Sequence, residues 1–370
     1  MANKTLNAAK AAKNDEFYTQ LSDIENELRH YKEHFRGKTV LCNCDDPRVS
    51  NFFKYFALNF EHLGLKRLIT TCYKNQDIDL FSQHECEQAV YLIYDGNKNG
   101  NHVPDAEEIG VHPLKGDGDF RSRECIELLK QADIVVTNPP FSLFREYVAQ
   151  LIKYEKKFLI LGRMSALHYS DIFPLIKANK IWMGYGFNLS MVYKTSYENT
   201  NEANRKFVKS KGYNPNDNYI KVPAITWFTN LDHQKRHEKL ILYKRYSPEE
   251  YPKYYNYDGI DVNAVSDIPI DYDGEMGVPD TFLGNYNAEQ FELIGFSAEV
   301  PKTKEHISYK ERDLITYEVD GKIVWSTKYS VPERKAGNSL RLDDNGQPGK
   351  LPYSRIIIRH KRDNNEDTTK

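Results

Sequence analysis

Short apolar runs alternate with helical patterns over the first 180 residues of the chain. Residues 19–35 place apolar side chains at spacings of three and four, which predicts an amphipathic helix that ends before Gly37. The apolar runs that follow predict strands over Thr39–Cys42, Leu68–Cys72, Val90–Tyr94, Ile134–Thr137 and Phe158–Leu161. Helical patterns between them cover Ser50–Leu63, Arg123–Gln131 and Leu143–Tyr154.

Strands separated by helical segments are typical of a parallel sheet with crossover helices. We therefore predict a fold of the α/β class with an open, doubly wound, Rossmann-like sheet. In such sheets, ligands bind beyond the carboxyl ends of the strands, near the switch in strand order. Any site is expected where these strands end.

The pattern changes after about Lys180. Residues 181–194 and 221–244 read as longer strands, and the polar segment 195–220 between them reads as a loop. Together they predict an antiparallel hairpin that closes one edge of the sheet.

From Ser247 onward, Pro, Gly, Asn and Asp interrupt short segments, and helical periodicity is scarce. This indicates a smaller, irregular, β-rich region with a disordered polar tail from about Asp363. The predicted organisation is an α/β domain over residues 1–244 and a C-terminal region over residues 245–370.

The 370 residues are 28% charged and include five scattered cysteines. The longest apolar runs, such as Ile134–Val136, are far shorter than the roughly 18 residues of a membrane span. The N-terminus lacks the apolar core of a signal peptide, and an odd cysteine count does not fit a disulfide framework. We therefore expect a cytoplasmic protein rather than a secreted or membrane-inserted one.

The net charge of −2 hides an uneven distribution. Residues 247–300 carry twelve Asp and Glu against the single basic residue Lys253, whereas residues 301–370 carry fifteen Lys and Arg against eleven acids. A nucleic-acid partner is therefore compatible with the chain only through local basic surfaces outside most of 247–300.

The apolar strand at Ile134–Thr137 runs directly into Asn138, Pro139, Pro140 and Phe141. The prolines hold the turns after the strand without using backbone donors. The Asn138 side-chain oxygen and the Pro139 carbonyl can then both accept hydrogen bonds from one exocyclic amino group, and Phe141 offers a ring face for stacking. Two acceptors help the amino lone pair attack an electrophilic methyl, so positioning and electrostatics carry the catalysis. A plain strand-to-helix turn is the structural alternative.

Asn-Pro-Pro-Phe in this setting resembles the fourth motif of class I, S-adenosylmethionine-dependent amino-methyltransferases. A closer match is to the EcoRI-type family of adenine-specific DNA methyltransferases, over roughly residues 14–300. The segments that carry the resemblance are NDEFYTQ (14–20), VLCNCDDPRVSNFF (40–53), GDGDF (116–120), TNPPFSLF (137–144), FLILGRMSA (158–166), KIWMGYG (180–186), WFTNLDH (227–233) and MGVPDTFLGNYNAEQFELIG (276–295). The resemblance implies that residues 1–244 form the catalytic domain and that residues 245–370 contribute to DNA target recognition.

The resemblance implies that the amino-terminal residues Phe17, Tyr18 and Thr19 touch the methionine part of S-adenosylmethionine. It places the cofactor loop directly after the first strand, where the residues expected to line it are Cys44, Asp45 and Pro47, with Asp45 meeting the ammonium group or a bound water.

This loop departs from the family's usual pattern because it contains no Gly-x-Gly, which would let the backbone approach the cofactor closely. Its neighbour Asp46 fits a helix cap as well as it fits a ligand contact.

Asp117, Asp119 and Phe120 resemble the third motif, in which an acid meets the amino group of the cofactor's adenine and an aromatic ring meets its face. Asn138 also borders the cofactor in this family. A simple Gly-Asp-Gly-Asp turn is the alternative for the third motif. No carboxylate follows the second strand, where the ribose is usually held, so either Asp95 takes that role or the region is rearranged.

An adenine amino group inside a duplex lies out of reach of a pocket at a sheet edge, so the implied reaction requires base flipping at a cost of a few kcal/mol. Contacts from basic side chains to phosphates must offset this cost. The candidate DNA-binding residues are Lys13, Arg205, Lys206, Lys235, Arg236 and Arg245. The basic clusters are Lys4/Lys10/Lys13, Lys235/Arg236/Lys239, Lys244/Arg245 and Arg355/Arg359/Lys361/Arg362. For any single cluster, a solvated surface is the commoner explanation.

The resulting hypothesis is a site-specific DNA adenine N6-methyltransferase that uses S-adenosylmethionine and acts on a flipped-out adenine, either beside a separate restriction endonuclease or as an orphan enzyme. Two alternatives remain open. One is a methyltransferase for RNA or a protein glutamine, and the other is a catalytically silent DNA-binding protein with the same fold. No Cys/His set has zinc spacing, so no metal is expected.

Overall fold

The computed structural model describes residues 19–44, 50–71, 89–97, 104, 108–194, 199–254, 257–297, 314–319, 322–327, 341–344, 347–350 and 354–361. The chain divides into two compact units, residues 1–233 and 234–370. Outside the described residues lie the predicted tail from Asp363 and the candidates Lys4, Lys10, Lys13, Phe17, Tyr18, Asp45, Asp46, Pro47 and Arg362. Within the described part, no helix is long and apolar enough to cross a membrane.

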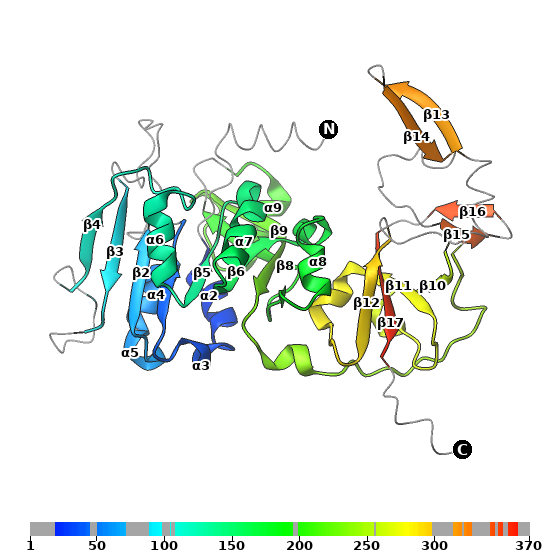
Figure 1. The fold of residues 1–370 in the computed structure, drawn as a ribbon, viewed down its shortest axis with the longest axis horizontal. Coiled ribbons are helices and arrows are strands. Elements are labelled where there is room, and N and C mark those ends of the chain that lie inside the picture. Colours follow the sequence, from blue (N-terminus) through cyan, green and yellow to red (C-terminus); the bar gives the residue numbers. More distant parts are fainter. Residues whose placement is uncertain are drawn as a thin grey trace, which may run out of the picture. The chain divides into compact units, whose positions relative to one another are not determined.

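The first unit is a mixed α/β fold around one large sheet (Figure 1). Its helices are α2 (Leu21–Leu28), α3 (Lys32–Phe35), α4 (Asn51–Leu58), α5 (Phe60–Leu63), α6 (Arg123–Gln131), α7 (Phe144–Lys153), α8 (Phe173–Lys177) and α9 (Glu202–Ser210), with the short 3-10 helices η1 (Phe141–Leu143) and η2 (Met164–His168). Its strands are β1 (Thr39–Cys42), β2 (Arg67–Thr71), β3 (Val90–Tyr94), β4 (Gly110–Pro113), β5 (Ile134–Thr137), β6 (Lys157–Arg163), β7 (Trp182–Met183), β8 (Leu189–Lys194) and β9 (Tyr219–Thr229).

The strand order is β4-β3-β2-β1-β5-β6-β9-β7, with β8 also paired to β9. The central strands β2, β1, β5 and β6 are parallel. The chain moves from β1 to β2 through α4 and α5, and from β5 to β6 in the other direction through α7. Right-handed crossovers therefore place these helices on opposite faces of the sheet (Figure 1). The predicted doubly wound α/β fold is confirmed, and its switch point lies between β1 and β5.

Antiparallel strands flank this parallel centre. β3 runs antiparallel to β2, so the third predicted strand does not continue the parallel winding. At the other edge, β9 runs antiparallel to both β6 and β8. β9 is thus part of the predicted hairpin, but it ends at Thr229. After it, the Asn230 side chain accepts a hydrogen bond from the Phe158 amide of β6 (2.8 Å) and donates one to the carbonyl of Lys156, which precedes β6 (2.9 Å).

The prediction of a loop over 195–220 is wrong, because helix α9 lies within it. Asn201 caps the helix by accepting a hydrogen bond from the Asn204 amide (3.0 Å). The helix buries only Val208 fully, and so narrow an apolar face leaves little periodic signal in the sequence.

The predicted helix over 19–35 is divided into α2 and α3 around a buried carboxylate. Glu27 accepts hydrogen bonds from the Tyr31 hydroxyl (3.0 Å) and from the amides of Tyr185 (2.8 Å) and Gly186 (2.7 Å). A side chain on Gly184 would lie 2.3 Å from Glu27. This buried contact fastens the amino-terminal helices to the segment that follows β7.

The second unit contains a four-stranded sheet in the order β10-β11-β17-β12, which confirms the predicted irregular β-rich region. Its elements are η3 (Gln234–His237), β10 (Gly259–Asp261), η4 (Val265–Asp267), β11 (Glu275–Pro279), η5 (Asp280–Asn285), β12 (Phe291–Phe296), β13 (Leu314–Val319), β14 (Lys322–Thr327), β15 (Arg341–Asp344), β16 (Gln347–Lys350) and β17 (Arg355–His360). β13 pairs with β14, and β15 pairs with β16.

The basic cluster at the end of the chain has a structural role in this sheet. Arg355 is 3% exposed and forms an ion pair with the buried Asp261 (2.8 Å). Arg359 is more exposed and pairs with Glu292 (2.7 Å). Removing one partner of a buried ion pair leaves an uncompensated charge, so Arg355 is committed to the fold of this unit.

Candidate active site

The carboxyl ends of β1 and β5 meet at the switch point, and a hydrogen bond joins them there. The two strands pair in parallel through Val40 and Ile134. At the end of β5, the Thr137 hydroxyl donates to the carbonyl of Asn43, which directly follows β1. The segments predicted to hold the cofactor and to carry catalysis are therefore neighbours in space.

Asn138, Pro139, Pro140 and Phe141 form a compact turn after β5. Asn138 is 7% exposed, with its amide oxygen buried, and Pro139 is also buried. The Pro140 carbonyl accepts the amide of Leu143 (2.9 Å) and so begins η1. Among the described residues, no backbone donor bonds the carbonyl of Pro139. The turn presents the half-buried Phe141 ring beside a desolvated asparagine.

A cation lies over the ring of Phe141. Arg163, the exposed last residue of β6, places its guanidinium carbon 5.8 Å from the ring centroid. The preceding Gly162 lets the start of α7 pack against β6, because a side chain there would lie 2.6 Å from the ring of Phe144. Arg163 thus stands at the same edge as Asn138, contributed by the next strand of the sheet.

Tyr147 on α7 ties the catalytic helix to the cofactor segment. Its hydroxyl donates to the side-chain oxygen of Asn43, and the residue is 2% exposed. Burial raises the pKa of Tyr147 well above its usual range, so the phenol remains a neutral donor. Asn43 therefore uses its carbonyl for Thr137 and its side chain for Tyr147.

Cys44, the first residue of the predicted cofactor loop, has a glycine-like backbone conformation. Cys44 has a φ of +78°, in the left-handed region that L-residues rarely occupy. The left-handed backbone expected of a glycine directly after β1 is therefore adopted by a half-buried cysteine.

The segment predicted as the third motif docks against α7. Phe120 is 7% exposed, and its ring packs edge-on against Tyr147 with centroids 5.0 Å apart. Its carbonyl accepts a hydrogen bond from the Gln150 side chain (2.9 Å). The structure thus brings Phe120 and the Asn43–Cys44 segment against one buried tyrosine.

The two acids of this segment have different partners. Asp119 accepts hydrogen bonds from the Arg121 backbone (2.8 Å) and guanidinium (2.7 and 2.9 Å). The Arg121 hydrogen bonds hold the pKa of Asp119 below its usual range. Asp117 accepts only the Asp119 amide (3.0 Å) among the hydrogen bonds described here. Asp119 is therefore engaged in bracing the turn, and Asp117 is the better placed of the two to meet a ligand.

Thr19 lies beside the helix that follows the cofactor loop. It is 1% exposed, and its carbonyl accepts the Asn51 side chain (2.7 Å). Its hydroxyl is buried and has no hydrogen-bond partner among the described residues. The amino-terminal segment therefore reaches the start of α4, as the predicted cofactor contact requires.

Asp95, the alternative ribose ligand, lies at the wrong edge of the sheet. Because β3 is antiparallel to β2, the residue after β3 falls beside the amino end of β2. There the carboxylate of Asp95 accepts two hydrogen bonds from Arg67 (2.7 and 3.0 Å). This position favours the other alternative, in which the ribose-binding region is rearranged.

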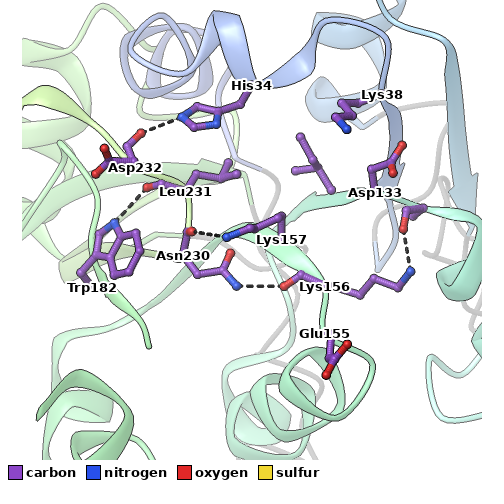
Figure 2. Close-up of a pocket in the computed structure, with 12 residues that line it drawn as sticks. His34, Lys38, Asp133, Glu155, Lys156, Lys157, Trp182, Asn230, Leu231 and Asp232 are labelled. Carbon is purple, nitrogen blue, oxygen red and sulfur yellow. Dashed lines mark hydrogen bonds between the residues drawn. The ribbon is translucent and has the colours of Figure 1, made fainter. Parts of the chain in front are cut away.

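A cavity of about 520 Å³ lies at the opposite edge of the sheet, where the parallel strands begin (Figure 2). Lys38 precedes β1, Asp133 precedes β5 and Lys157 opens β6. The Lys156 ammonium donates to two backbone carbonyls (2.9 and 2.7 Å), and burial lowers its pKa. This cavity is therefore separate from Asn138.

The candidate DNA-binding residues differ in their surroundings. Arg205 bonds the carbonyls of Asn199 and Pro215 (3.1 Å each), so it braces the segment around α9. Lys206 is exposed and pairs with Glu202 (2.8 Å). In the second unit, Lys235 and Arg236 are half-buried, whereas the side chain of Arg245 is 83% exposed.

Sequence reasoning did not identify Asn43, Tyr147 or Arg163 as site residues. Asn43 and Arg163 occupy strand ends equivalent to that of Asn138, which was an available signal. Tyr147 was indistinguishable from an ordinary core position on an amphipathic helix. Among the residues that the structure describes, no group of three His, Cys, Asp or Glu side chains is arranged to hold a metal ion.

The chain has close relatives among known proteins. It is 49% identical over 365 residues to the Type II methyltransferase M.EcoRI of Escherichia coli, with 97% of each chain covered. It is 42% identical to M.MgeORF184P of Mycoplasma genitalium and to M.MpnI of Mycoplasma pneumoniae, both named Type II methyltransferases, over 78% of this chain and 84% of each relative. No solved structure matches the chain significantly.

The family described as Adenine-specific methyltransferase EcoRI matches residues 5–361, nearly the whole chain. This confirms the resemblance drawn from the Asn138–Phe141 motif and its companion segments. Membership in such a family implies a methyl-donor cofactor. The chain belongs to the EcoRI family of adenine-specific methyltransferases.

Proposed function

We propose that the protein is a site-specific DNA adenine N6-methyltransferase that uses S-adenosylmethionine. The observation that carries this proposal is the position of Asn138–Phe141 at the switch point, joined through Thr137 to the Asn43 carbonyl. The relatives named Type II methyltransferases support DNA as the substrate and support a paired restriction endonuclease that acts separately. Because its relatives come from bacteria, where DNA lies in the cytoplasm, we propose a cytoplasmic location.

The described residues fit S-adenosylmethionine. The left-handed backbone at Cys44 supplies the conformation that a glycine usually has at this position, and Thr19 offers a buried hydroxyl that no described residue engages. Asp117 is placed to accept from the adenine amino group of the cofactor, with Phe120 forming the adjoining wall and Asn138 the boundary with the substrate. When bound, this cofactor supplies an electrophilic methyl group on a sulfonium.

Asn138 and Pro139 position the target amino group. The side-chain oxygen of Asn138 and the carbonyl of Pro139 accept its two N–H groups, which directs the lone pair of the nitrogen away from both acceptors. Phe141 stacks on the flipped base. Methylation would break the sulfur–methyl bond of the bound cofactor, release a neutral thioether and leave the nitrogen cationic. Both acceptors would stabilise this charge until one proton is lost to solvent. The site needs no nucleophilic residue, because preorganised acceptors lower the barrier.

The test uses labelled S-adenosylmethionine and unmethylated genomic DNA, followed by digestion to nucleosides. We expect N6-methyladenine from the wild-type protein. Asn138→Ala should lower turnover by about 10²–10³-fold with cofactor affinity nearly unchanged, since it removes an acceptor that acts in the transition state. The exposed Asn263 provides a matched control, because Asn263→Ala should retain wild-type turnover.

Wild-type-like turnover by Asn138→Ala would overturn the assigned mechanism. Cofactor binding without label in DNA would direct the search to RNA and protein glutamine as acceptors. Tight DNA binding without methylation of any acceptor would instead identify a catalytically silent DNA-binding protein.

A further inference from the structure

An extended segment of the second unit presents alternate side chains to solvent. From Lys239 to Arg245, the odd-numbered residues are exposed and the even-numbered residues are half-buried. Ile241 is 90% exposed, Tyr243 is 68% exposed and the side chain of Arg245 is 83% exposed. We refer to Lys239, Ile241, Tyr243 and Arg245 as the basic strip. Its two-residue period is that of one face of a β-strand.

The segment is extended but belongs to no strand, although the sequence predicted one there. Instead of the regular hydrogen bonds of a β-sheet, contacts with residues elsewhere in the unit hold this segment. Gln290 bonds both the amide (2.7 Å) and the carbonyl (2.9 Å) of Leu240. Asp267 pairs with the Lys244 ammonium (3.0 Å), and the Ile270 amide donates to the Lys244 carbonyl (2.9 Å). The inward side is therefore anchored at both ends, which fixes the outward side as a surface.

The charge of this surface differs from the charge of the sequence that follows. Residues 234–246 contain five Lys or Arg and one Glu, whereas residues 247–300 contain twelve acids and one Lys. Arg245 approaches an acid only loosely, at 3.7 Å from Asp271. Within this part of the chain, a polyanion is attracted to residues 234–246 and repelled by the residues after them.

The spacing also suits a duplex. A fully extended chain rises about 3.3 Å per residue, so six residues span up to about 20 Å. This span corresponds to roughly six base steps at 3.4 Å each. Basic side chains at the two ends can then reach phosphates, while Ile and Tyr between them face the groove. Exposed aliphatic and aromatic side chains of this kind contact sugars and bases where DNA is bent or unstacked.

We propose that the basic strip is a DNA-contacting surface, in which Lys239 and Arg245 neutralise phosphates and Ile241 and Tyr243 contact the groove between them. This inference rests on the proposed function, since it takes DNA as the substrate. It adds two apolar contacts to a region where only basic residues were predicted to bind.

A second copy of the chain is a poorer occupant of the same surface. Antiparallel pairing of the strip with itself places Lys239 of one copy opposite Arg245 of the other at both ends. Like charges directly opposite each other destabilise a strand pair. Phosphates offer the complementary charge at both positions.

Two double variants test the proposal with a labelled fragment of unmethylated genomic DNA. Lys239→Gln/Arg245→Gln should reduce the slope of log affinity against log salt by about 2, because each lost phosphate contact removes about 0.9. Ile241→Ser/Tyr243→Ser should weaken binding about tenfold or more while the slope stays unchanged. Val111→Ser, at a similarly exposed position on β4, is the matched control and should bind like the wild type.

Unchanged affinity and slope in both double variants would overturn the inference. A wild-type dimer that Ile241→Ser/Tyr243→Ser converts to monomer, with DNA affinity unaltered, would also overturn it and assign the strip to self-association. DNA binding is measured without methyl transfer. Failure of the proposed function, seen as no N6-methyladenine from the wild type, is therefore distinguishable from failure of the strip.

Discussion

The hydroxyl of Tyr147 on α7 donates to the side chain of Asn43 at the end of β1, and both residues are buried. Tyr147 lies on the helix that begins three residues after the Asn138–Phe141 turn, and its ring packs against Phe120. Asn43 in turn precedes Cys44, whose backbone makes the left-handed turn of the cofactor loop. The side chain of Tyr147 therefore contacts two of the segments that the sequence predicted to form the site, through Asn43 and Phe120.

Tyr147→Phe should destabilise the first unit by roughly 1–3 kcal/mol, because it leaves a buried acceptor on Asn43 without its donor. Affinity for S-adenosylmethionine should fall further than stability alone explains, since the cofactor loop loses its support. Thermal unfolding and equilibrium dialysis measure the two effects. Tyr154→Phe, at the end of the same helix, should change neither, and equal effects from both variants would refute the role of the Asn43 contact.

The conformation of Cys44 predicts an unusual order of stability. Cys44→Gly should be more stable than Cys44→Ala by roughly 1 kcal/mol, because alanine keeps the cost of a positive φ and glycine removes it. Both variants lack the thiol, so chemical unfolding isolates the backbone effect. At Cys42, in strand β1 of the sheet, the order of stability should reverse, so that Cys42→Ala is more stable than Cys42→Gly. An alanine variant at Cys44 as stable as the glycine variant would contradict the left-handed turn.

Arg163 should act on DNA rather than on the cofactor. Its guanidinium lies over Phe141 at the rim of the site, where it can meet a phosphate of the flipped nucleotide. Arg163→Gln should raise the KM for DNA by roughly tenfold, with S-adenosylmethionine affinity unchanged, and Arg163→Lys should restore part of the loss. Steady-state kinetics at varied DNA concentration measures this change in KM. The same rise in Arg123→Gln, on the exposed side of α6, would indicate a general charge effect.

The Asp119–Arg121 pair should contribute to the pH dependence of stability. Because the folded-state pKa of Asp119 is lowered, the ionised carboxylate stabilises the fold above the unfolded-state pKa of about 4. That contribution is lost as the pH falls through 4 toward the folded-state value.

Asp119→Asn should therefore lower the melting temperature near neutral pH and flatten its decline on acidification. Solvent screening of the half-exposed Arg121 limits the effect to below about 1 kcal/mol. Melting curves from neutral pH to well below about pH 4 measure the effect, with the exposed Asp258→Asn as control. A decline in Asp119→Asn as steep as in the wild type would show that the pair does not titrate with folding.

The apolar runs predicted the central strands closely, because each is buried on both faces and bounded by polar residues. β1, β3 and β5 have the predicted bounds, and so does α6. The pairing direction of β3 could not be read from its sequence, since an apolar run of five residues fits either direction. That direction decides the position of Asp95, so the ribose contact was beyond sequence reasoning.

The candidate site was predictable where its residues follow strands and unpredictable where they depend on packing. Asn138 stands out because two prolines follow a buried strand. The role of Tyr147 depends on how α7 lies against β1, and the bracing role of Arg205 depends on the fold around α9. Such contacts join residues far apart in the sequence, and no local pattern encodes them.

The hydrogen bonds that join Asn43 to Thr137 and Tyr147 place two ligands on one shared support. We expect a reorientation imposed at Cys44 by a bound methyl donor to reach, through Asn43, the strand end that carries Asn138. By thermodynamic reciprocity, the target base should then alter the affinity for the donor by the same factor as the donor alters the affinity for the base. The hydrogen bonds of Asn43 are therefore expected to couple the binding of the two substrates.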